Sequence, residues 1–333
     1  MWIMVSRTPP GPRSELLYSI TSGNQVAHQQ PAADSDSDPL RTSTRLRLTR
    51  LRGEADNTNS TRESPTQNLP VKPPSLYLDL EGIRLGRHGS ISIISLYVIP
   101  TAKIYLIDIY TLGGAAFSAT NSNSVSLKTV LESPAIPKVI FDVRNDSDAL
   151  FSHFQISVDC IKDLQLMELA SRMGNRAYVH GLAKCIEEDS PVSTIVKTEW
   201  QRTKDSASRL YNPEKGGRYE VFNERPMRPE IKEYCARDVA LLPGLYGVYA
   251  AKLQKEGAFW RVLVRDATTD RIKLSQSTSY NGQSGDKRCG PWDEWNIQEA
   301  MEAWNEEVWW NIRTNDFVLN EDDDWVSPTS KEG

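Results

Sequence analysis

Apolar and polar residues begin to alternate at Leu76, after about 73 residues without such a pattern. Three short apolar runs follow, at 76–80, 91–98 and 103–110, and glycines between the first two mark a tight link. Runs of this length predict strands, and the short links favour an antiparallel meander.

Strand-like and helix-like segments alternate after the meander. Short apolar runs predict two further strands, at 138–143 and 156–160. Apolar residues at helical spacing predict helices at 126–132, 145–153, 164–173, 179–187 and 227–242, with a continuation at 245–253 beyond a proline. Strands first and then strands alternating with helices predict an α/β fold, with a mixed sheet of five strands flanked by helices.

The N-terminal segment outside this pattern is residues 1–73, which are rich in Ser, Thr, Pro, Asn and Asp and predict a disordered leader. Within it, Arg41–Arg52 carries arginines with leucines between them. Two interpretations remain for this patch: a nuclear-targeting or nucleic-acid-contacting segment, or a solvated basic stretch without a specific role.

Residues 74–254 are expected to form one globular domain, and residues 255–333 a C-terminal extension. The extension is dense in tryptophan, and a helix is predicted from Trp295 to Trp310. Its apolar side is expected to pack on the domain, or else to meet a protein partner. The acidic residues 320–324 predict a solvated tail.

Charge and cysteine content narrow the classes of function. A formal net charge of −5 excludes attraction of nucleic acid by the whole surface, so such a partner needs a local basic groove or metal ions. The four cysteines show no metal-binding spacing and suit a reducing compartment. No apolar run reaches the roughly 18 residues of a membrane span. We therefore expect a soluble intracellular protein of the nucleus or cytoplasm that makes no contact with a membrane.

Three groups of polar residues are candidates for chemistry. Asp79 and Glu81 share one face of the first strand, where they are either ligands of a divalent cation or caps of the turn at Gly82. Asp146 follows the fourth strand, and is a candidate ligand or a helix N-cap. Tyr234 and Asp238 stand one turn apart beside the apolar stripe of a helix, where a structural Tyr–Asp pair is the alternative.

Together these groups resemble the DEDD superfamily of 3′–5′ exonucleases, in the subgroup with a tyrosine in its third motif, which includes ribonuclease D and Werner-type exonuclease domains. Asp79 and Glu81 match the first motif, Asp146 the second, and Tyr234 with Asp238 the third. The similarity runs from about residue 74 to about residue 253, and it is strongest to fungal 3′–5′ exonuclease-domain proteins. Stretches such as DLEG, FDVRNDSDAL and YCARDV carry it.

The resemblance implies a ribonuclease H-like fold and a two-metal hydrolysis of phosphodiester bonds at the 3′ end of single-stranded RNA or DNA, with Mg²⁺ or Mn²⁺. It implies that Asp79 bridges the two cations, that Glu81 and Asp238 help to hold the first, and that Asp146 helps to hold the second. Tyr234 is then expected to orient the attacking water. A catalytically silent nucleic-acid-binding or scaffold protein on the same fold is the alternative.

A basic segment, residues 197–218, supplies candidate contacts to the substrate. Phosphates attract basic side chains and bases stack on aromatic ones, so the candidates are Lys197, Trp200, Arg202, Lys204 and Tyr211. An ordered surface loop with solvated charges is the equal alternative.

Overall fold

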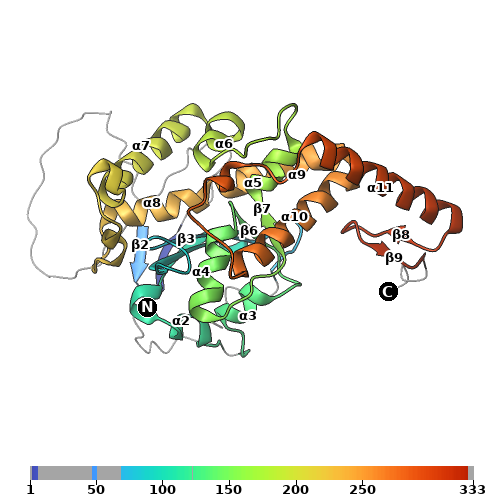
Figure 1. Cartoon of the computed structure of the whole chain (residues 1–333). Helices are drawn as coiled ribbons and strands as arrows, with labels where there is room; N and C mark the ends of the chain where they lie inside the picture. The colour runs from blue at the N-terminus through green and yellow to red at the C-terminus, as the bar shows by residue number, and fades with distance from the viewer. Residues whose placement is uncertain (1, 7–46, 51–68, 122, 329–333) are drawn as a thin grey trace, which may run out of the picture.

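A mixed β-sheet lies at the centre of the molecule (Figure 1). The computed structural model describes residues 2–6, 47–50, 69–121 and 123–328. The order of the strands in the described sheet is β2-β1-β5-β4-β3-β6-β7. Their bounds are β1 Trp2–Ser6, β2 Arg47–Arg50, β3 Leu76–Glu81, β4 Ile93–Val98, β5 Lys103–Asp108, β6 Lys138–Ile140 and β7 Ile161–Asp163. The predicted five-stranded mixed sheet is confirmed: β3, β4 and β5 form the antiparallel meander, and β6 and β7 run parallel to β3.

Two strands from the predicted leader extend this sheet. β1 pairs with β5 from Trp2 opposite Ile107 to Ser6 opposite Lys103, and β2 pairs with β1. Pairing at the edge satisfies backbone groups that β5 would otherwise leave open, a benefit that composition alone does not reveal. Part of the arginine-rich patch therefore lies on β2, and the rest of the patch and of the leader lies outside the described residues.

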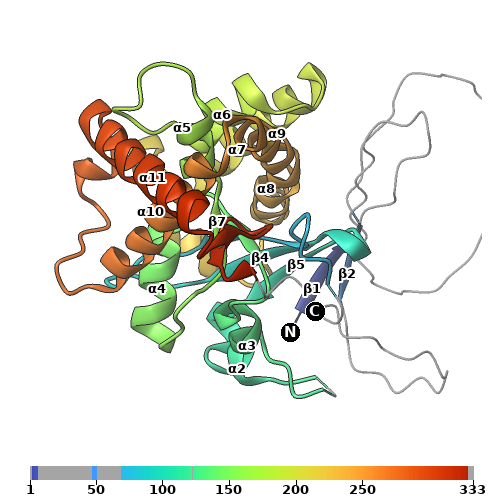
Figure 2. The ribbon, with the colours of Figure 1, turned by 90° about the vertical axis from the view of Figure 1, so that its right-hand side faces the viewer.

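Two separate cores cover the two faces of the sheet, because side chains alternate along each strand. Leu76, Leu78 and Leu80 face a core shared with α2, α3 and α4, whereas Tyr77 faces a core shared with α5 to α9. Figures 1 and 2 show these helices on opposite sides of the strands. The helix bounds are α1 Ile109–Leu112, α2 Ala115–Ser118, α3 Leu127–Glu132, α4 Arg144–Phe154, α5 Leu164–Ser171, α6 Leu182–Asp189, α7 Thr194–Tyr211, α8 Pro229–Ala240 and α9 Leu242–Glu256.

One local prediction and one of the alternatives are wrong. Residues 156–160 are not a strand: Ile156 and Val158 are buried alternately as in a strand, but the chain turns at Cys160 with φ +49° before β7 begins. The basic segment at 197–218 is not a surface loop, because most of it lies in α7, which Ser193 caps. The sequence signal for this helix is the seven-residue spacing of the buried Trp200 and Ala207, which lies within an otherwise basic and polar segment.

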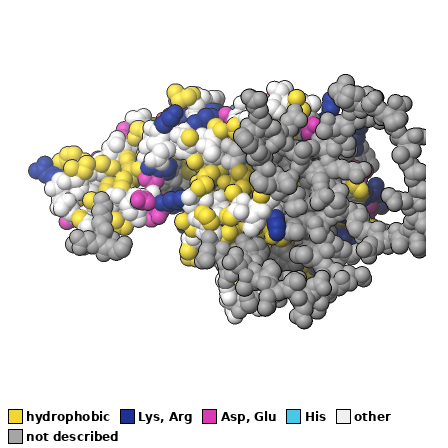
Figure 3. Space-filling model, turned by 180° about the vertical axis from the view of Figure 1, so that it is seen from behind, with side chains coloured by type: hydrophobic (Ala, Val, Ile, Leu, Met, Phe, Trp, Pro, Cys, Tyr) yellow, Lys and Arg dark blue, Asp and Glu magenta, His cyan; other side chains and the backbone are white. Residues whose placement is uncertain are grey.

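The C-terminal extension begins with α10 (Ala258–Gln276), which packs on α4, α5 and α9. The predicted helix is confirmed as α11 (Glu294–Thr314), which runs away from the sheet (Figure 1). Its packing agrees with the expectation only in part: Ile297 packs against the core, whereas Trp295, Trp309 and Trp310 are exposed. Figure 3 shows apolar side chains along the part of the molecule that projects away from the sheet, which contains α11.

The acidic residues 320–324 are not a solvated tail. Asp323 accepts hydrogen bonds of 2.6 Å from the guanidinium of Arg261, and Asp324 pairs with Arg265. Both arginines lie on α10, so these pairs attach the hairpin of β8 (Val318–Leu319) and β9 (Trp325–Val326) to that helix. Among the described helices, none is both long enough and apolar enough to cross a bilayer.

Candidate active site

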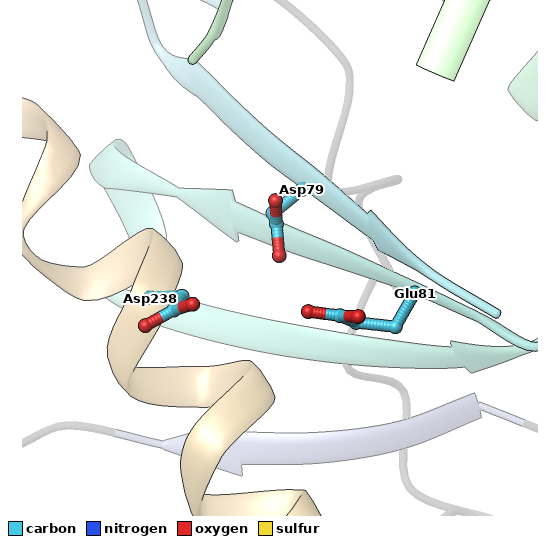
Figure 4. Close-up of side chains that lie close together, drawn as sticks. All are labelled: Asp79, Glu81 and Asp238. Atoms are coloured by element: carbon cyan, nitrogen blue, oxygen red, sulfur yellow. The ribbon is translucent and has the colours of Figure 1, made fainter. Parts of the chain in front are cut away.

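Three carboxylates from two distant parts of the chain meet on one face of the sheet. Asp79 and Glu81 project from β3, and Asp238 projects from α8, as Figure 4 shows. One oxygen from each lies within 4.8 Å of the others. The predicted convergence of these three residues is therefore present in the structure, and Asp79 and Glu81 do not cap a fraying strand end.

Local sequence explains how these side chains are aimed. The leucines of β3 hold one face of the strand in the α2–α4 core, so Asp79 and Glu81 must point to the opposite side, toward α8. On α8, Ile231, Cys235 and Val239 are fully buried and fix the rotation of the helix. Because Asp238 lies beside that stripe, it faces the sheet.

Burial makes this cluster a strong candidate for a cation site. Burial, followed by repulsion from Asp238, raises the pKa of Asp79 to about 7, and burial followed by repulsion from Asp79 raises the pKa of Glu81 well above its ordinary value. Oδ2 of Asp79 and Oδ1 of Asp238 are buried without a hydrogen-bond partner. Buried carboxylate oxygens without donors are costly, and a hard divalent cation is the partner that they fit.

Asp146 lies near this cluster but outside the group of three. It is buried in the first turn of α4. Its pKa is raised well above the ordinary value by burial and then by repulsion from Asp79, so the two carboxyl groups are close enough to interact. The N-cap of α4 is Val143, without a side-chain cap, so the capping interpretation of Asp146 is wrong.

Tyr234 is buried at the site, on α8 one helical turn before Asp238. Its ring is 5.5 Å from that of Tyr211, and its hydroxyl acts to lower the pKa of Glu81 against the larger effect of burial. Burial and then the charge of Glu81 raise the pKa of Tyr234 well above 10. The phenol is therefore neutral and acts as a hydrogen-bond donor.

The structure corrects part of the predicted substrate surface. Trp200 is only 2% exposed, so its ring is unable to stack a base, and the half-buried Tyr211 is already stacked on Tyr234. Nζ of Lys204 lies 3.2 Å from Oδ2 of Asp238, inside the carboxylate cluster. Lys197 donates to the carbonyl of Glu187.

Arg202 is exposed on α7. Of the five candidate substrate contacts, it is therefore the one whose side chain is free to meet solvent-borne phosphates.

One basic residue near the site was not predicted. Lys287, from the extension, lies 4.0 Å from Oδ2 of Asp142, and its charge acts to lower the pKa of Asp146 against the larger effect of burial. It lies in a short 3-10 helix, Gly285–Arg288, which has no apolar periodicity, so its sequence gives no signal of this position.

The raised pKa values predict how the stability of the metal-free protein depends on pH. The pKa of Asp79 is about 7 in the folded state and about 3.9 in an unfolded chain, so the folded state binds more protons between these values. The free energy of unfolding must therefore fall as pH rises from about 4 to about 7. Glu81 and Asp146 shift in the same direction. We expect a lower Tm at pH 8 than at pH 5.5 in EDTA, by about 2–4 °C for each kcal/mol lost.

The carboxyl group of Asp142, whose pKa is lowered, does not disturb this window. In Asp142, burial acts to raise the pKa, but hydrogen bonds from Arg144 hold it below the ordinary value. Its contribution to stability is present above about pH 4 and is lost only in stronger acid. Thermal unfolding followed by circular dichroism at the two pH values tests the prediction, and an equal or higher Tm at pH 8 in EDTA would contradict it.

Comparisons with known proteins agree with this geometry. Residues 63–256 match the sequence profile of the 3′–5′ exonuclease domain family. The human piRNA biogenesis protein EXD1 is 27% identical over 165 residues, which are 49% of this chain and 29% of that protein. The chain thus spans less than a third of the length of this curated relative.

The structure of one RNase D supports the fold, and that of a second is similar at a lower score. Trypanosoma brucei RNase D, in its complex with RNA U12, superposes with a TM-score of 0.50 at 17% identity, covering 68% of this chain and 71% of that one. Escherichia coli RNase D, described as an exoribonuclease involved in structured RNA processing, has a TM-score of 0.44 at 20% identity, covering 62% of this chain and 46% of that one.

Proposed function

The chain belongs to the 3′–5′ exonuclease domain family, and from this premise we propose that it hydrolyses phosphodiester bonds at the 3′ ends of single-stranded RNA or DNA by a two-metal mechanism. One observation carries the proposal: the carboxylates of the half-buried Asp79 and Glu81 and of the buried Asp238 converge, and Oδ2 of Asp79 and Oδ1 of Asp238 are buried without a hydrogen-bond donor. Such a site is expensive to build unless cations complete it.

The residues have distinct expected tasks. Asp79, Glu81 and Asp238 would hold the first cation, with Asp79 shared with the second, and Asp146 would hold the second from the side of α4. Divalent ions bound there would supply an activated water and neutralise the charge on the leaving oxygen. The hydroxyl of Tyr234 is a neutral donor beside Glu81, which suits it to orient a water molecule and not to remove a proton from it.

A nucleic-acid substrate is supported by two lines of similarity. The family is one of 3′–5′ exonucleases, and a structure that shares the fold was solved with RNA bound. Arg202 on α7 is the remaining candidate for a contact with phosphates.

A degradation assay on matched RNA and DNA oligonucleotides labelled at the 5′ end tests the proposal. We expect a ladder of shortened labelled products with Mg²⁺ or Mn²⁺, and intact substrate with EDTA. An oligonucleotide blocked by a 3′ phosphate serves as the control for direction. Binding of the oligonucleotide without degradation under every metal condition would instead support the silent scaffold protein.

A further inference from the structure

The ammonium group of Lys204 lies at the carboxylate cluster although it comes from a different helix. Its Nζ is 3.2 Å from Oδ2 of Asp238, and only a quarter of its side chain is exposed. Its positive charge also attracts the carboxylates of Asp79 and Glu81. Lys204 is thus the cation that faces these three acids in the described structure.

Aromatic rings hold this ammonium group in place. Trp200, one turn earlier on α7, is buried, and the centre of its ring is 4.8 Å from Nζ. The ring of Tyr234 is 5.6 Å from Nζ on α8. A lysine loses considerable side-chain entropy when it is fixed, and two cation–π contacts together with an ion pair offset that loss. Contacts with Trp200, Tyr234 and Asp238 therefore fix the position of the Lys204 ammonium group.

The ammonium and a divalent ion have overlapping partners. Lys204 occupies Oδ2 of Asp238, whereas Oδ1 of the same carboxylate has no hydrogen-bond partner. An ion bound by the three carboxylates would meet a positive charge within a few ångströms, which weakens binding.

We propose that Lys204 is a built-in counter-ion of the metal site, which holds the acids together before metal arrives and competes with the metal for Asp238. The inference rests on the proposed function, because it concerns the same carboxylates. Lys204 is thereby a positioning residue, and its role is to set the affinity of the site for cations.

This role predicts two effects of opposite sign for Lys204→Met, which keeps much of the side-chain length and removes the charge. Affinity for Mn²⁺ should rise by about tenfold or more, which corresponds to about 1.4 kcal/mol. The Tm in EDTA should fall, because the acids repel one another without the ammonium. A purely structural lysine would lower both quantities when it is removed.

The experiment is calorimetric titration of the full chain with MnCl₂, paired with thermal unfolding in EDTA. Lys204→Arg keeps the charge and should bind Mn²⁺ as the parent does. Lys255→Met removes an exposed charge near the end of α9 and is the matched control. Equal or weaker Mn²⁺ binding by Lys204→Met than by the parent overturns the inference and leaves the proposed function standing. Absence of Mn²⁺ binding by the parent overturns the proposed function itself.

A measurement on the parent protein keeps the inference testable if Lys204→Met does not fold. In protein labelled with ¹³C at lysine Cε, the signal of Lys204, assigned by its loss in Lys204→Arg, should move during titration with MgCl₂. A signal of Lys204 that stays in place while Mg²⁺ binds overturns the inference.

Discussion

The Asp79→Asn variant is expected to lose at least about a thousandfold in exonuclease rate, which corresponds to about 4 kcal/mol of transition-state stabilisation. The carboxylate of Asp79 interacts repulsively with those of Glu81, Asp238 and Asp146. An amide keeps the size of the side chain and removes one negative charge, so cations should bind weakly. Degradation of a labelled oligonucleotide under single-turnover conditions measures the loss.

The same variant should be more stable than the parent in EDTA, because one member of a buried, mutually repelling cluster becomes neutral. The fall in Tm between pH 5.5 and pH 8 should also become shallower. Asp270→Asn, an exposed change on α10, is the control, and it should alter neither activity nor Tm. Parent-like activity of Asp79→Asn would remove Asp79 from the catalytic set, whatever its effect on stability.

The Arg271→Met variant is expected to destabilise the protein by about 3–5 kcal/mol, because it leaves a buried carboxylate without its ionic partner. Asp163 is fully buried, and its Oδ2 accepts a hydrogen bond of 2.7 Å from Nη1 of Arg271. The other contacts of this carboxylate are backbone N–H groups of Asp142, Val143 and Gln165. They hold the turn that leads into α4.

Urea unfolding of the full chain measures the loss, and Lys273→Met is the matched control because this lysine is exposed two residues farther along α10. A loss below 1 kcal/mol would show that the pair is dispensable. Since Arg271 lies in the predicted extension and Asp163 in the predicted domain, a large loss would mean that the boundary expected near residue 254 does not separate two independent folding units.

The packing of α10 also indicates that the C-terminal extension does not begin as a separate folding unit. Trp260 and Val264 of α10, and Trp292 after it, are buried in the same core as Tyr77 and Tyr234. We infer that residues 258–292 belong to the folded unit that carries the site.

Short-range spacing explains what could be predicted from sequence. Alternation along β3 places Asp79 and Glu81 on one face, and the four-residue spacing of Tyr234 and Asp238 places them on one side of α8. Both rules act within a single element. The motif resemblance then linked the elements, because no local rule brings residue 79 next to residue 238.

Long-range pairing explains what could not be predicted. Lys204 meets Asp238 across 34 residues, and Arg271 meets Asp163 across 108. No periodicity encodes such partners, so the sequence predicts Lys204 as a contact to the substrate and not as a partner of Asp238. Tryptophan content was equally uninformative about exposure, since Trp260 and Trp292 are buried whereas Trp295 is 74% exposed.

The division of β3 between two faces has a consequence for how the chain tolerates change in length. A residue inserted or deleted between Leu76 and Asp79 would turn Leu80 toward α8 and the two acids into the apolar core on the other side. One such change would remove Leu80 from the core and the two carboxylates from the site, although no side chain had been replaced. The spacing within these six residues is therefore expected to be less tolerant of change than the identity of any one of the leucines.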